Sequence, residues 1–171
     1  MKTNQNFGLL FFLLVICQII LCNYACFGPY ILLSMLPAMI LCIPIGISTI
    51  ACMMIAFASG LAVDWLSEGL LGINAASIIP AALTRKAVIK LFLGEDIIAR
   101  NDTFSIRKNG LVKVSLALLS TSALFLAVYI FLDGAGTRPL WFCFARFCAS
   151  LACSWPIGIM VINLLCPDDR K

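Results

Sequence analysis

Histidine is absent from the 171 residues, and charged residues make up only 12% of them. The missing imidazole removes the commonest general base and the commonest metal ligand in proteins. Between Lys2 and Asp64 the chain has no charged residue at all. Because a soluble domain is about a quarter charged, this scarcity of charge argues against a water-soluble fold.

Cysteine pairing of a recognisable kind is also lacking. The nine cysteines form no Cys-x-x-Cys pair, and nearly all lie inside apolar runs. Small hydrophobic side chains in packed or lipid-facing positions explain them better than disulfides or a metal site. Motifs such as Gly-x-Ser-x-Gly and a phosphate-binding loop are missing as well. We therefore expect no catalytic residues, no cofactor, no metal and no nucleic-acid partner.

Apolar residues, by contrast, are abundant: they make up 63% of the chain, and the mean hydropathy is +1.07. The apolar runs are continuous rather than alternating, which predicts membrane helices and not barrel strands. At about 20 residues per span, the chain has room for about six helices and no sizeable soluble domain. We predict one all-α, polytopic membrane domain over residues 1–171.

The spans expected from the apolar runs cover residues 7–27, 28–43, 47–65, 73–92, 111–132 and 140–165. The first could instead be a signal peptide, although Asn-Tyr-Ala-Cys at 23–26 is a poor cleavage site. Pro37 should kink or divide the short second span, and Pro80 should bend the fourth. At the end of the fourth span, Arg85, Lys86 and Lys90 can snorkel to the lipid headgroups.

Six spans would place ten of the twelve basic residues on one side of the membrane, because Arg138 alone falls opposite and Arg146 lies within a span. The positive-inside rule then puts both termini and the polar segment 93–110 in the cytoplasm. The basic residues of that segment could contact cytoplasmic filaments or only anionic membrane lipids.

Arg146 is the most costly residue to place in a membrane, since it lies roughly 9 Å into its span at about 1.5 Å per residue. A buried guanidinium needs a partner or a route to the surface. One interpretation is an internal pair with Asp64 or Asp133, or snorkelling to the outer headgroups. The other is a site for a partner or a solute.

Asp64 ends the charge-free run, and Glu68 follows four residues later on the same side of a continued helix. Paired carboxylates can perform acid–base chemistry, but no other catalytic group accompanies these two. A turn containing Gly69 and Gly72 comes next. The simpler role for Asp64 is to cap the Gly72 turn and to fix two helices.

The pattern Gly60-x-x-x-Asp64-x-x-Ser67-x-x-x-x-Gly72-x-x-Ala75 resembles the central signature of the rod shape-determining protein MreD family. Trp155-Pro156 in the last span matches a Trp-Pro pair of that family. The chain length, the short second span, the basic segment after the fourth span and the basic C-terminal tail agree with it. The cysteine-rich spans and the long, mixed-charge 93–110 segment depart from it.

The resemblance implies a non-enzymatic component of the cell-elongation machinery in the bacterial inner membrane. Such proteins bind the single-span protein MreC. Together they regulate the class B penicillin-binding transpeptidase and the glycosyltransferase that build side-wall peptidoglycan, alongside cytoplasmic MreB filaments. The fold of the family is similar to the substrate-binding subunit (S-component) of energy-coupling-factor vitamin transporters.

The residues that we expect to shape the helices or to bind a partner are Gly60, Asp64, Ser67, Gly72, Asn74, Ala75, Arg146, Trp155 and Pro156. A vitamin-binding transporter subunit is the alternative, with Arg146, Asp64 and Asn74 lining a modest pocket. The first span lacks the Ala-x-x-x-Ala face that such subunits often use for docking. An intramembrane enzyme acting on lipid-linked substrates is the third class.

Overall fold

The computed structural model describes residues 7–24, 31–68, 71–95, 97, 104, 106–134 and 138–166. Within them the chain is helical and contains no strand, as predicted. The elements are α1 (Phe7–Tyr24), α2 (Leu36–Cys42), α3 (Thr49–Val63), the π-helical turn η1 (Asp64–Glu68), α4 (Ile73–Leu93), α6 (Ile106–Asn109), α7 (Leu111–Gly134) and α8 (Leu140–Leu165).

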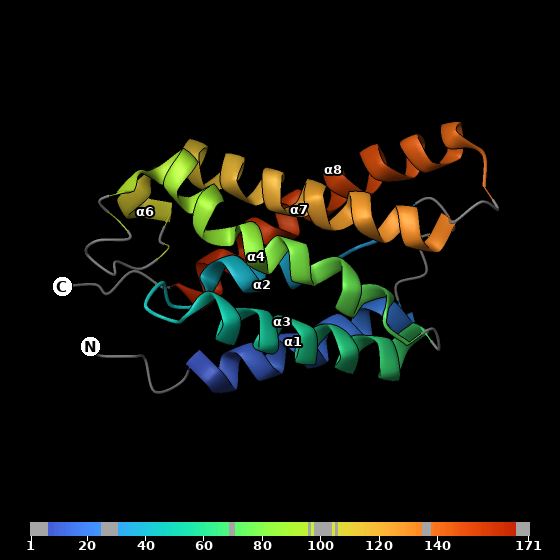
Figure 1. Cartoon of the computed structure of the whole chain (residues 1–171), viewed down its shortest axis with the longest axis horizontal. Helices are drawn as coiled ribbons and strands as arrows, with labels where there is room; N and C mark the ends of the chain where they lie inside the picture. The colour runs from blue at the N-terminus through green and yellow to red at the C-terminus, as the bar shows by residue number, and fades with distance from the viewer. Residues whose placement is uncertain are drawn as a thin grey trace.

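The long helices lie side by side (Figure 1). Helices α1 and α3 run in the same direction, and the chain then reverses from α3 to α4, from α4 to α7 and from α7 to α8. The start of α1, the short helix α6 and the end of α8 lie at one end of the bundle. The turn between η1 and α4 lies at the other end. Helix α4 packs between α3 and α7, and α8 packs on α7 and α2.

Within the described residues, four segments are long and apolar enough to cross a membrane: α1, Thr49–Ser67 (α3 with most of η1), α7 and α8. The chain is therefore a helical membrane protein, and the prediction of spanning helices is confirmed for these four. Helix α4 also has sufficient length, but it carries Arg85, Lys86 and Lys90. It remains a single helix through Pro80.

The prediction of a helix over residues 28–43 is wrong for residues 31–35, which are irregular; residues 28–30 lie outside the described part. Helix α2 begins only at Leu36, and Pro37 lies in its first turn instead of interrupting it. Proline is well tolerated there, because the first N–H groups of a helix have no partner within the helix.

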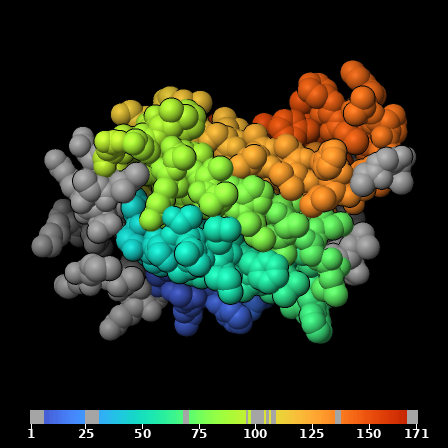
Figure 2. Space-filling view, viewed as in Figure 1, coloured from blue at the N-terminus to red at the C-terminus, as the bar shows by residue number. Residues whose placement is uncertain are grey.

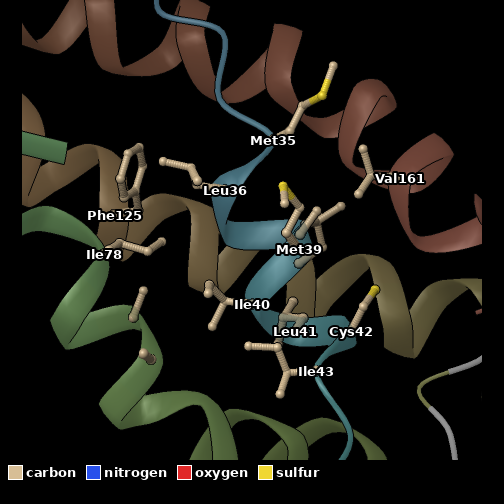
Figure 3. Packing of buried hydrophobic residues seen from close by; sticks show 14 of the residues in the cluster. Met35, Leu36, Met39, Ile40, Leu41, Cys42, Ile43, Ile78, Phe125 and Val161 are labelled. Atoms are coloured by element: carbon tan, nitrogen blue, oxygen red, sulfur yellow. The ribbon is translucent and has the colours of Figure 1, made fainter. Parts of the chain in front are cut away.

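Every residue of α2 is buried, so this short helix forms the centre of the hydrophobic core. Figure 3 shows Leu36 and Ile40 among side chains of the neighbouring helices, with Ile78 and Phe125 on one side and Val161 on the other. Side chains of α3, α4 and α7 form a continuous surface over one face of the molecule (Figure 2). The core is therefore built around a helix too short to cross a membrane.

The irregular segment that leads into α2 is held by the side-chain amide of Gln18 on α1. Gln18 Oε1 accepts a hydrogen bond from the Met35 N–H at 2.7 Å, and Gln18 Nε2 donates to the Leu33 carbonyl at 3.0 Å. Backbone groups inside a bilayer must find partners within the protein, because no water is available there. Gln18 supplies two of these partners.

Two serines on α8 supply further hydrogen-bond partners for the backbone of residues 31–35. The Leu32 N–H donates to Ser150 Oγ at 2.8 Å, and the Ser34 N–H donates to Ser154 Oγ at 3.3 Å. The Ser154 hydroxyl in turn donates to the Leu32 carbonyl at 3.3 Å. Non-helical backbone is tolerated at membrane depth when it is enclosed by protein in this way. Helices α1 and α8 thus act as two sides of a clamp on residues 31–35.

We expect Gln18→Leu to lower the free energy of unfolding by about 2 kcal/mol or more, since it leaves the buried Met35 N–H and the partly buried Leu33 carbonyl without partners. Thermal unfolding of the purified protein in detergent measures the change. Asn163→Leu is the matched control, because Asn163 is exposed on α8. Equal unfolding midpoints for the two variants would contradict the clamp.

Candidate functional site

A buried carboxylate joins α3 to α4. Asp64 follows α3 directly and is 0% exposed. Its Oδ2 accepts hydrogen bonds from the N–H groups of Gly72 (3.0 Å) and Ala75 (3.1 Å). Its Oδ1 accepts from the backbone N–H (3.0 Å) and the side-chain Nδ2 (2.9 Å) of Asn74. Both carboxylate oxygens are therefore saturated by donors at the start of α4.

Gly72 explains why the cap comes from so far away in the sequence. It is the residue before α4 and has φ of 103°, a left-handed conformation that favours glycine. Glycine has no side chain with which to cap the helix. The free N–H groups and the positive end of the α4 dipole are instead satisfied by Asp64, eight residues earlier. Asp64 thus has the capping role that its position suggests.

Gly60 allows α3 and α4 to pack in close contact. A Cβ atom built on Gly60 would lie 2.7 Å from the Cα of Ala75 and 2.8 Å from its backbone nitrogen. The backbones of α3 and α4 therefore touch at this point. Small residues permit such close packing in lipid, where helices associate through van der Waals contact. We call Gly60, Asp64, Gly72, Asn74 and Ala75 the Asp64 hub.

Ser67 lies in η1 beside the hub, and its hydroxyl donates to the Val63 carbonyl. The Leu66 carbonyl of the same turn accepts a hydrogen bond from Asn23 Nδ2 of α1 at 3.1 Å. The π-helical turn therefore also ties α1 to the end of α3. The side chain of Glu68 lies outside the described residues, and the predicted carboxylate pair with Asp64 falls there.

Arg146 pairs with Asp133 at the end of α7. The two side chains are 13% and 19% exposed, and the Arg146 guanidinium lies 5.9 Å from the centre of the Tyr129 ring. Of the two internal partners considered from the sequence, Asp133 is the one observed, because Asp64 is occupied by α4. The pair joins α7 to α8.

We expect a double-mutant cycle of Asp133→Asn and Arg146→Gln to give a coupling free energy of about 1–3 kcal/mol, since the pair is largely buried. Thermal unfolding in detergent measures each corner of the cycle. Lys90 and Glu95 form an exposed pair, in which the hydrogen bond from Lys90 lowers the pKa of Glu95. That pair is the matched control and should show a much smaller coupling, because water screens exposed charges. Equal coupling in both cycles would contradict the importance of the buried pair.

The prediction that Arg85 snorkels to the lipid headgroups is wrong, because the residue is only 1% exposed. Its guanidinium donates to the carbonyls of Leu41, at 3.3 Å, and Ile43 at the C-terminal end of α2, and its Nη1 faces Cys52 Sγ at 4.0 Å. The last carbonyls of a helix lack partners and carry the negative end of its dipole. Arg85 therefore caps α2 from α4.

Trp155 and Pro156 lie together near the middle of α8, and both are exposed on the outside of the bundle. The candidates from the sequence thus occupy three places. Those around Asp64 form the hub, Arg146 lies between α7 and α8, and the Trp-Pro pair faces outward. They do not form one pocket.

Four polar residues that hold the fold together were not recognised as such from the sequence. They are Gln18, Arg85, Ser150 and Ser154. Gln18 is the one strongly polar residue of its apolar run, and the serines are one helical turn apart in another. Such residues mark the sides of membrane helices that face backbone or side-chain partners.

The fold and composition define the class of protein as a helical membrane protein with a core helix buried between the spanning ones. No protein-family model, curated protein or solved structure matches the chain.

Proposed function

We propose that this chain is a non-enzymatic scaffold of the MreD type, which binds MreC in the bacterial inner membrane and regulates the peptidoglycan synthase pair. The observation that carries the proposal is the Asp64 hub. The residues Gly60, Asp64, Gly72 and Ala75 of the family signature meet at one point and serve one purpose, which is to fix α4 against α3. These signature residues therefore hold α3 and α4 in a fixed arrangement.

Rigid helices suit a protein that acts by packing against others in the bilayer. The outer sides of α1, α3 and α8 are apolar and exposed within the chain. Association of such surfaces depends on van der Waals fit and a few polar contacts. A single-span partner such as MreC offers the matching kind of surface. Contacts with the transpeptidase, its glycosyltransferase partner and MreB filaments would then be indirect.

We further propose that the chain passes through the membrane six times, with the irregular residues 31–35 and helix α2 belonging to the second pass. The arrangement in Figure 1 supports this topology, because the start of α1, α6 and the end of α8 lie at one end. The exposed side chain of Lys113 on α7 lies near α6, at the same end. The positive-inside rule assigns that end, and with it both termini, to the cytoplasm.

The alternative, a vitamin-binding subunit, requires Arg146, Asp64 and Asn74 to share a pocket. Asp64 and Asn74 hydrogen-bond each other at the hub, whereas Arg146 pairs with Asp133. These internal bonds favour the scaffold proposal over the transporter, because they occupy the groups that would recognise a solute.

The proposal is tested by depleting the protein in its native bacterium. We expect depleted cells to lose their rod shape, and expression of the unaltered chain to restore it. Asp64→Ala should fail to restore it, because the hub is broken. Glu95→Gln is the control that should restore it, since Glu95 is exposed. Depleted cells that keep both rod shape and side-wall synthesis would contradict the proposal.

A further inference from the structure

One side of α8 is formed by residues that are exposed in the described part of the chain. It is formed by Phe144, Cys148, Ala152, Trp155, Pro156 and Met160. Their spacing of mostly three and four residues places them on one helix face. The opposite side of α8 packs on α7 and α2. Figure 1 shows α8 at the edge of the bundle.

The backbone on this exposed face has an acceptor without its helical donor. Pro156 has no N–H, so the Ala152 carbonyl lacks the hydrogen bond that residue 156 would normally donate. Ala152 lies about 18 Å from the start of α8 and about as far from its end, at roughly 1.5 Å per residue. That depth is near the middle of a bilayer, where no water can replace the missing donor.

Pro80, in the interior of α4, provides a contrast. Pro80 leaves the Ala76 carbonyl without its donor in the same way, but Ala76 lies in the first turn of α4. That turn is at an end of the bundle, where water and lipid headgroups can reach it. Pro156 and Pro80 thus each leave one carbonyl, that of Ala152 or of Ala76, without its helical donor. Of these two carbonyls, only that of Ala152 is both in an exposed position and near the middle of the membrane.

A donor without an acceptor lies beside it. The indole N–H of Trp155 donates to no group in the described part of the chain, and the residue is 37% exposed. Trp155 and Ala152 are three residues apart, so they are neighbours on the face. Inside a bilayer no water can accept from an indole N–H, so a protein acceptor stabilises it. The face therefore carries one free donor and one free acceptor, which makes it complementary to itself.

We propose that this face of α8 is a contact between two copies of the chain, related by a two-fold axis along the membrane normal. In such a contact each copy contributes the same patch, so every contact between two different residues occurs twice. The small side chains of Cys148 and Ala152 let the two helices approach closely. Trp155 of each copy then donates to the carbonyl of Ala152 of the partner subunit. Phe144 and Met160 pack on either side. This inference does not depend on the proposed function.

The experiment measures the monomer–dimer equilibrium of the full chain in lipid bilayers by energy transfer between labelled copies. We expect Ala152→Leu to weaken the dimer at least tenfold, because the added side chain separates the helices. Trp155→Phe keeps the ring and removes both symmetric hydrogen bonds, so we expect it to weaken the dimer about tenfold. Ala58→Leu is the matched control, since Ala58 is exposed on α3. All variants should keep the thermal midpoint of the unaltered protein.

Cross-linking gives a second measurement on the same membranes. A short bifunctional maleimide should produce a covalent dimer that Cys148→Ser abolishes. A monomeric chain, or equal dimer affinities for Ala152→Leu and Ala58→Leu, would overturn the proposal. Cross-linking of Cys148 to a different single-span protein, with no link between two copies, would also overturn it and assign the face to that protein. Rod-shape assays test the proposed function separately.

Discussion

Asp64→Ala is expected to lower the free energy of unfolding by about 4 kcal/mol or more. Four hydrogen bonds end on this one carboxylate, and without it three buried donors and one partly buried donor would lose their acceptor. Each unsatisfied donor costs about 1–3 kcal/mol, although the effects are not additive. Water cannot take the place of the carboxylate without rearrangement, because Asp64 is 0% exposed.

Thermal unfolding in detergent should show the loss as a fall in the midpoint of roughly 10 °C. Asp64→Asn should lie between Asp64→Ala and the unaltered protein, because an amide keeps one acceptor but turns an N–H group toward former donors. Glu95→Gln is the control, since it removes a carboxylate charge from an exposed position. An unchanged midpoint for Asp64→Ala would show that the hub does not hold α4 in place.

Gly60→Leu is the second substitution with a large expected effect. The Cβ position of Gly60 lies 2.7 Å from backbone of α4, which cannot turn aside as a flexible side chain can. The two helices must therefore separate, and the hydrogen bonds of Asp64 lengthen as they do. We expect a loss of about 3 kcal/mol or more, at the upper end of what overpacking usually costs.

Gly8→Leu is the matched control for this substitution, because a Cβ atom at Gly8 on α1 would meet nothing within 4 Å. Both changes replace a helical glycine by the same large side chain. Thermal midpoints should fall for Gly60→Leu and not for Gly8→Leu. A similar, small effect of both would mean that α3 and α4 are not held in close contact in the membrane.

The sequence predicted the long helices well. Helix α8 begins at Leu140 and ends at Leu165, as the apolar run indicates, and α7 continues to Gly134, just past the predicted end at residue 132. Helix α1 begins at Phe7 as predicted and is helical to Tyr24, and the rest of the predicted span 7–27 lies outside the described residues. These helices are visible in the sequence because a membrane span must be long, apolar and flanked by polar residues or turns.

Helix α2 could not be predicted in the same way. An apolar run contains no sign of whether its backbone is helical, and Pro37 is compatible with a kink or with a helix start. The groups that stabilise the irregular segment are on distant helices: Gln18 is 15 residues away from Leu33, and Ser150 is 118 residues away from Leu32. Such pairings depend on how the helices pack.

The partners of the charged residues also depend on how the helices pack, so the sequence alone does not determine them. Sequence spacing could offer Asp64 and Asp133 as partners of Arg146 but could not choose between them. Arg85 was expected at the membrane surface with Lys90, because both end the same helix. The structure buries Arg85 against the end of α2, whose position no local pattern reveals. Capping of α4 by Asp64 was predictable because the turn between them is short.

We propose that the chain works by binding protein partners in the membrane. This proposal is tested most directly by a mild-detergent pull-down of the tagged chain from its native cells, with proteins and small molecules in the eluate identified by mass spectrometry. We predict recovery of MreC together with the transpeptidase and glycosyltransferase of wall synthesis. Recovery of an ATPase, a coupling subunit and a stoichiometric vitamin would contradict the claim and identify a transporter subunit.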